Sequence, residues 1–213
     1  MKLGLLAVTL VIAGFGQVRA QTILYDNIGA SSAGSDSPFN FGPLADSFST
    51  GGSSINIFDL KLLLNTTGNT GTITVSLLDD NTTNPGNILA TLGTLPDSAL
   101  TGSNAIYDFP FSPFSLNAST RYWIQVNSDD GSSANWSRSL DTSGTGVAGE
   151  FFANLNGVFT NGNGPYQMQL FGISAVPEPT TWALIGVGTL GTGVYAWRKK
   201  RLAINAGMEE LKV

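Results

Sequence analysis

The 213-residue sequence contains no cysteine and no histidine. Without cysteine the chain forms no disulfides and has no thiol chemistry. Without histidine it lacks the commonest general base, the usual serine–histidine pairs and nearly all zinc and copper sites. These absences exclude the most familiar nucleophilic and metal-dependent enzyme mechanisms.

Charge is also scarce, because charged residues make up 12% of the chain. In residues 21–176 three basic residues, Lys61, Arg121 and Arg138, stand against twelve acidic ones, which gives a net charge of −9. A segment this acidic is repelled by phosphate backbones. We therefore expect no nucleic-acid partner.

The N-terminal end carries a short apolar run. Met1 and Lys2 form a charged start, an apolar stretch follows from Leu3 to about residue 15, and a small residue, Ala20, closes the pattern. This order predicts a signal peptide over residues 1–20 that is cleaved after Ala20. The alternative is an uncleaved anchor helix, for which the run is short.

A second apolar run lies near the C-terminus. Residues 180–197 carry no charge, and a helix of that length spans about 27 Å, enough for a bilayer core. Trp182 and Trp197 bracket the run at positions that suit the two membrane interfaces. Four cations follow it: Arg198, Lys199, Lys200 and Arg201. We predict a transmembrane helix with the preceding domain outside and residues 202–213 as a cytoplasmic tail; a buried core helix is the alternative.

Residues 176–181 read Val-Pro-Glu-Pro-Thr-Thr, and Pro177 and Pro179 hold the chain extended around Glu178. The segment is either a processing handle beside the membrane or a simple linker. Together with the apolar span and the basic cluster, residues 176–201 resemble a PEP-CTERM sorting signal, found in Gram-negative bacteria that make exopolysaccharide. The resemblance implies recognition by an exosortase, a membrane enzyme that cleaves near Pro-Glu-Pro.

The intervening residues 21–175 show the pattern of short strands and turns. Residues 72–77 and 121–126 alternate between apolar and polar side chains. Residues 55–64 form a longer run with an irregularity near residues 58–59 that suggests a bulge. This pattern predicts an all-β domain, an antiparallel β-sandwich of jelly-roll type.

Two parts of this domain, residues 30–43 and 141–149, have the composition of loops. Elsewhere the domain resembles the exported choice-of-anchor domains, most closely type R. The residues that carry the resemblance are Ala45-Asp46-Ser47-Phe48, the 77–92 stretch with Pro85-Gly86, and residues 116–126. It implies a location at the cell surface.

A group of oxygen-bearing side chains occupies one expected turn: Asp79, Asp80, Asn81 and Asn84. Hard cations such as calcium take several such oxygens. The spacing does not match an EF-hand loop. These residues are either a weak calcium site or a solvated hairpin turn rich in Asp and Asn, and the composition favours the turn.

Two tryptophans, Trp123 and Trp136, are candidates for stacking on sugar rings; the alternative is ordinary sandwich core. Glycoside hydrolysis would need two facing carboxylates, and the domain has one glutamate, Glu150, and eleven aspartates, most of them in turn-like positions. We expect no enzyme activity and no cofactor other than the calcium considered above.

These features favour an exported structural or interaction protein that is tethered to the inner membrane and then reaches the cell surface or the extracellular space. Its expected partners are an exosortase-like enzyme, membrane lipid through the C-terminal helix, and exopolysaccharide. A carbohydrate-binding module is the first alternative, and a secreted hydrolase is the second.

Overall fold

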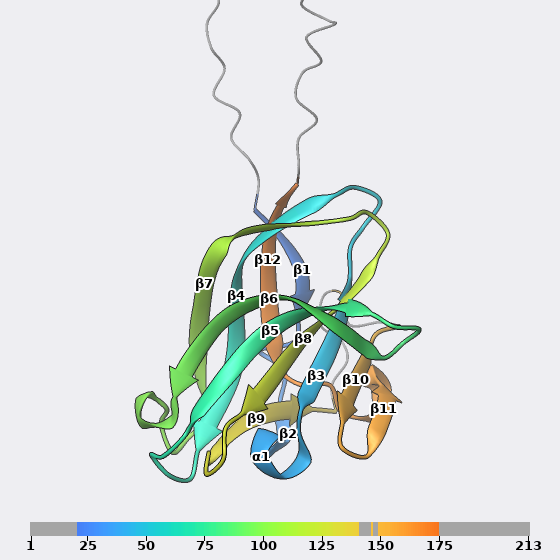
Figure 1. The fold of residues 1–213 in the computed structure, drawn as a ribbon. Coiled ribbons are helices and arrows are strands. Elements are labelled where there is room, and N and C mark those ends of the chain that lie inside the picture. The colour runs from blue at the N-terminus through green and yellow to red at the C-terminus, as the bar shows by residue number, and fades with distance from the viewer. Residues whose placement is uncertain (1–20, 141–145, 147–148, 175–213) are drawn as a thin grey trace, which may run out of the picture. The chain divides into compact units, whose positions relative to one another are not determined.

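The computed structural model describes residues 21–140, 146 and 149–174, which form mainly β-strands (Figure 1). The first six strands are β1 (Gln21–Asp26), β2 (Ser32–Asp36), β3 (Leu44–Ser49), β4 (Ile55–Thr66), β5 (Thr72–Asp80) and β6 (Pro85–Pro96). The others are β7 (Ala105–Leu116), β8 (Arg121–Ser128), β9 (Ala134–Ser139), β10 (Phe151–Asn154), β11 (Gly157–Thr160) and β12 (Met168–Ser174). The short helical turns are α1 (Pro38–Phe41), η1 (Asp97–Ala99) and η2 (Asn161–Asn163).

The strands form two antiparallel sheets packed as a sandwich, which confirms the predicted β-sandwich. One sheet has the order β1-β12-β4-β9-β2, and β7 also pairs with β4. The other has the order β11-β10-β3-β8-β5-β6. The predicted C-terminal transmembrane helix lies outside the described residues; within them the structure has no helix whose length and hydropathy would let it cross a bilayer.

Alternating side chains build the core between the sheets. Ile73 and Val75 of β5 and Ile124 and Val126 of β8 are fully buried there, as their period of two predicts. The expected bulge is confirmed, because the pairing of β4 with β7 shifts register between Ile57 and Asp59. The shift re-aligns the apolar residues of the long β4 strand with the core.

The outer face of the second sheet has a smaller apolar cluster. Trp123 is out of phase with the inward residues of β8 and packs instead with Ala45, Leu78 and Ala153. Its indole Nε1 donates a hydrogen bond of 2.8 Å to Asp80 Oδ1. Trp123 is therefore buried on the side of the sheet that faces away from the main core.

Strands β1 and β12 lie side by side and antiparallel, with Gln21 opposite Ile173. The start of β1 and the end of β12 thus lie at the same end of the sandwich (Figure 1). We call this the attachment end, because the C-terminal segment continues from Ser174. From Met168 to Ser174, β12 runs about 20 Å to reach it.

The prediction of a loop over residues 30–43 is wrong in part, because this range contains β2 and α1. Strand β2 has no apolar alternation, and it pairs with β9 with help from polar side chains. The Ser32 and Ser137 hydroxyls lie 2.7 Å apart, and Ser139 Oγ donates to the Ser31 carbonyl at 2.7 Å. Most of residues 141–149 lies outside the described residues.

Candidate functional site

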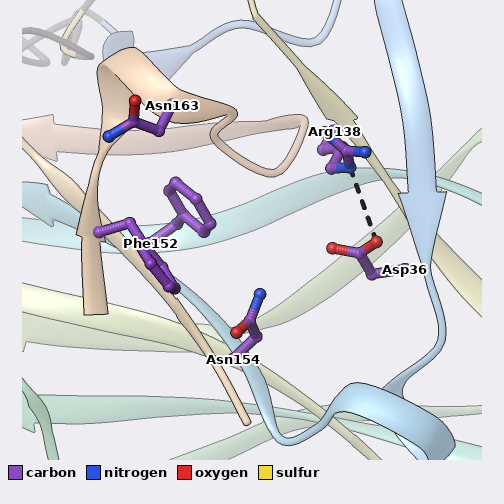
Figure 2. A pocket seen from close by; sticks show the side chains of 6 residues that line it. Asp36, Arg138, Phe152, Asn154 and Asn163 are labelled. Atoms are coloured by element: carbon purple, nitrogen blue, oxygen red, sulfur yellow. Dashed lines mark ion pairs between the residues drawn. The ribbon is translucent and has the colours of Figure 1, made fainter. Parts of the chain in front are cut away.

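A pocket of about 450 Å³ lies where the β2–β9 pair of one sheet meets the β10–β11 hairpin of the other. The residues that line it are Asp36, Arg138, Phe152, Asn154, Phe159 and Asn163. Figure 2 shows the Asp36–Arg138 pair facing Phe152 across the pocket, with Asn154 and Asn163 at its borders. The pocket therefore combines an ion pair, aromatic rings and side-chain amides from both sheets.

The ion pair holds its two groups in place. Arg138 Nε lies 3.6 Å from Asp36 Oδ1, and Asp36 Oδ2 accepts a 2.9 Å hydrogen bond from the Tyr166 hydroxyl. The guanidinium passes between Gly34 and Gly164, whose φ angles of +132° and +125° suit glycine. Among the described residues the structure shows no hydrogen bond from Arg138 Nη1 or Nη2.

Aromatic rings form a column beneath the pocket. Phe159 stacks on Phe152 at 5.2 Å, and Phe152 meets Tyr166 edge to face at 5.8 Å. Tyr166 in turn stacks on Trp136 at 4.7 Å. The column extends from the fully buried Trp136 to the half-buried Phe159, so the pocket floor is part of the core.

Tyr166 links the pocket to the interior. Burial, and then the neighbouring Asp36 carboxylate, raise the pKa of its hydroxyl, so the hydroxyl stays protonated and donates to Asp36. Its backbone N–H donates to Asp46 Oδ2 at 2.6 Å. Tyr166 thereby orients the Asp36 carboxylate in the pocket and also binds the buried carboxylate of Asp46.

Asp46 lies fully buried behind the pocket. Burial raises the pKa of this carboxyl well above its usual value, while the bonds from Tyr166, Asn161 and Tyr25 oppose the shift in part. Tyr25 Oη donates to Asp46 Oδ1 at 3.4 Å and accepts from Asn161 Nδ2 at 2.9 Å. The group supports the η2 turn, which carries the pocket residue Asn163.

Glu150 forms a second buried cluster next to this network. Its Oε2 accepts hydrogen bonds from Ser47 Oγ at 2.7 Å and from Arg121 Nε at 3.1 Å. Arg121 also lies over the Phe151 ring, 4.8 Å from its centroid. Glu150 is 5% exposed and does not line the pocket, so Asp36 is the one carboxylate among the lining residues.

Trp123 and Trp136, the two candidates for stacking on sugar rings, are core residues, as the alternative interpretation has it. Trp123 and Trp136 are both 0% exposed. Trp136 Nε1 donates to the Gln167 carbonyl at 2.9 Å, and its ring packs on Tyr166. Because neither indole has a free face, neither can act as a sugar-stacking platform; Trp136 supports the pocket from beneath.

The predicted calcium ligands lie at the β5–β6 turn, where protein groups already engage them. Asp79 accepts from the Asn87 backbone and side chain, and Asp80 accepts from Trp123 Nε1 and from the Thr83 N–H. Asn81 and Asn84 exchange two backbone hydrogen bonds. In the described part of the chain no three acidic side chains gather as a metal ligand set.

The family comparison concerns the other predicted site. The model of the PEP-CTERM protein-sorting motif matches residues 175–201. The match includes the predicted signal residues: Pro177, Glu178, Pro179, Arg198, Lys199, Lys200 and Arg201. It implies an exported protein that an exosortase processes and that is sorted to the cell surface. No curated protein matches the chain.

These signal residues, the span over residues 180–197 and the cleavage residue Ala20 lie outside the described residues. Sequence reasoning missed the pocket, because its residues come from five separate elements. Two signals pointed toward it: Arg138 is one of three cations in residues 21–176, and Asn163 lies in the turn-rich stretch 161–165.

Proposed function

We propose that this chain is a structural or interaction protein of the cell surface or extracellular matrix. The sorting motif at residues 175–201 supports this proposal, and it starts directly after Ser174, the last residue of β12. A folded domain thus leads without a further domain into a segment of the kind that an exosortase processes. The domain would be the part that reaches the surface.

The proposed sorting mechanism uses three segments with different physical properties. The uncharged run over residues 180–197 partitions into lipid, and the cations from Arg198 to Arg201 stop further transfer. Pro177 and Pro179 disfavour a helix around Glu178, the residue proposed to be recognised by the processing enzyme. The signal peptide over residues 1–20 would direct the export.

The domain itself is proposed to be of the choice-of-anchor kind, most like type R. Two of the stretches that carry this resemblance, residues 45–48 and 116–126, have clear structural roles. Residues 45–48 lie on β3 and residues 121–126 lie on β8, and these strands pair from Leu44–Val126 to Ser49–Arg121. Of the first stretch, Phe48 is in the main core, Asp46 is in the buried network and Ser47 binds Glu150. These roles are structural and support an anchor-domain scaffold.

The test replaces Glu178 by Gln, and separately Pro177 and Pro179 by Ala, in the full chain expressed in its natural host. Intact-mass measurement of protein from cells and from medium then reads both ends of the chain. We expect wild type to lose residues 1–20 and the residues after the Pro-Glu-Pro segment, and the variants to accumulate uncleaved at the C-terminus in the membrane fraction. Equal release of variants and wild type would contradict the proposal.

No catalytic role is proposed for the domain. A glycoside hydrolase would need two carboxylates that face one substrate. Among the residues that line the pocket, Asp36 is the one carboxylate. Carbohydrate binding without hydrolysis stays a second candidate function. The aromatic and polar lining of the pocket favours this function. The proposed contacts with sugar are therefore those of the pocket and not those of the buried Trp123 and Trp136.

A further inference from the structure

We propose that the pocket between β2–β9 and β10–β11 binds one neutral, hydroxyl-rich sugar unit of a polysaccharide. The inference deepens the second candidate function above by naming the binding residues and the ligand class. It does not depend on the sorting mechanism. The volume of about 450 Å³ lies within the range of about 300 to 1,000 Å³ that is typical of small-molecule sites.

Sugar hydroxyls both donate and accept hydrogen bonds, and the pocket offers partners for both roles. Arg138 Nη1 and Nη2 donate to no described protein group, and Asp36 keeps acceptor capacity beside its ion pair with Arg138 and the hydrogen bond that it accepts from Tyr166. Two adjacent hydroxyls could bind the planar carboxylate and the planar guanidinium together. Such charge-assisted bonds are among the strongest that a neutral ligand can form.

The amides extend this polar rim. Asn154 Oδ1 accepts from the Asn156 N–H at 2.9 Å, and Asn163 Nδ2 donates to Thr160 Oγ1 at 3.2 Å. Asn163 is exposed, so the pocket opens to solvent on its side. A bound unit could therefore continue into a longer chain outside the pocket.

The aromatic side suits the apolar C–H face of a pyranose ring. Phe159 is half-buried and stacks on Phe152, which is 6% exposed and rests on Tyr166. Because core packing holds these rings, little side-chain entropy is lost when a ligand contacts them. Phe152, which faces the ion pair across the pocket (Figure 2), and Phe159 stacked on it thus provide an aromatic surface for the ligand.

Charge decides between a neutral and an acidic sugar. The charges of Asp36 and Arg138 offset each other within the pocket, and residues 21–176 carry a net charge of −9. An acidic polysaccharide is repelled by this surrounding field, and its carboxylate would compete with Asp36 for Arg138. A neutral saccharide meets neither obstacle.

The experiment measures retention of the detergent-purified full chain in native gels that contain a polysaccharide. Neutral probes are a glucan, a mannan and a galactan; acidic probes are alginate and polygalacturonate. We expect retention by at least one neutral probe and by neither acidic probe. Arg138→Ala should weaken retention about tenfold or more, and Asn163→Ala about threefold.

Lys61→Ala is the matched control. It also removes one cation from an ion pair, that with Asp108 at 3.4 Å, and Lys61 does not line the pocket. It should retain wild-type binding. Circular dichroism of each variant reports the fold, and Asn163→Ala changes an exposed side chain, so the test remains valid if Arg138→Ala fails to fold.

Three outcomes would overturn the inference: no retention by any neutral probe, equal retention by the acidic probes, or retention that Arg138→Ala and Asn163→Ala leave unchanged. Failure here is separate from failure of the sorting proposal, because this assay measures binding and the sorting test measures release. A chain that is released normally and retained by no probe would retire the sugar site alone.

Discussion

The attachment end and the pocket end of the sandwich are built in different ways. At the attachment end, Ser174 pairs with Ile55 and Gln21 lies opposite Ile173, so main-chain pairing dominates. At the pocket end, Tyr166 joins the aromatic column, the ion pair and the buried Asp46 through its ring, hydroxyl and backbone. One end holds the chain in register, and the other gathers side chains from both sheets.

This comparison suggests a separation of roles along β12. The sorting motif continues from the attachment end, and the pocket lies beside the opposite end of the strand. A ligand bound in the pocket would then lie away from the point where the chain leaves the domain. The predictions below test whether the two ends differ in their contribution to stability and in their response to pH.

The largest expected effect comes from removing the base of the aromatic column. Trp136→Ala deletes a fully buried indole and removes one of the two donors to the Gln167 carbonyl, which keeps the Leu63 N–H. The loss of the indole should lower the free energy of unfolding by about 3–5 kcal/mol. At the attachment end, Ile55→Val should cost about 0.5–1.5 kcal/mol. Urea unfolding followed by tryptophan fluorescence measures both, and equal losses would contradict the difference between the ends.

The pocket end should also respond to pH through Asp46. Burial raises its pKa above the ordinary value of 3.8, so the folded protein binds this proton more tightly than the unfolded chain does. The stabilisation is complete below pH 3.8 and is lost as pH rises through the raised folded pKa. The free energy of unfolding of wild type should therefore fall as pH increases over this window.

Asp46→Asn resembles the protonated carboxyl and has no proton to lose, so its stability should depend less on pH. Urea unfolding at a series of pH values gives the slopes, and Asp108→Asn, at a position 61% exposed, controls for the loss of one carboxyl group. A slope for Asp46→Asn as steep as that of wild type would rule out Asp46 as the source.

The two arginine ion pairs should differ more modestly. Arg121→Ala leaves the 5% exposed Glu150 with one donor fewer, at a cost of about 1–3 kcal/mol. Arg138→Ala breaks a partly exposed pair, whose side chains are 35% and 21% exposed, and should cost about 1 kcal/mol or less. Thermal unfolding of the two variants compares them; a larger loss for Arg138→Ala would mean that the pocket pair stabilises the fold rather than serving a ligand.

The smallest expected effect is that of added calcium on the unfolding temperature. The carboxylates at the β5–β6 turn already accept hydrogen bonds from Asn87, Thr83 and Trp123. Adding calcium or a chelator should therefore shift the unfolding temperature by less than about 1 °C. A midpoint that rises steadily with calcium concentration would instead place a cation at Asp79, Asp80, Asn81 and Asn84.

Alternation predicted the strands whose core-facing apolar residues recur with a period of two. Residues 72–77 and 121–126 are strands, and the bulge near residue 58 is present. Strand β2 could not be found this way, because Ser32–Asp36 has no apolar residue larger than alanine and is held by pairing with β9. Its structure depends on a partner about 100 residues further along the chain.

Trp123 shows the limit of predicting burial from the alternation of side chains along a strand. Trp123 is out of phase with the inward residues of β8, which predicts exposure or a second layer. The second layer is what forms, since Ala45, Leu78 and Ala153 are small or apolar at the matching positions of neighbouring strands. Which positions match depends on the strand register, and a single sequence does not contain that information.

The sequence by itself determined the β-class of the domain and the sorting motif, because both are local. A period of two needs a few adjacent residues, and the motif is a continuous stretch of Pro-Glu-Pro, apolar span and basic cluster. Tertiary structure alone decided the pocket and the buried Asp46 network. Their residues become neighbours only when β2 pairs with β9 and β10 pairs with β3, and such long-range pairing is set by packing of the whole sandwich.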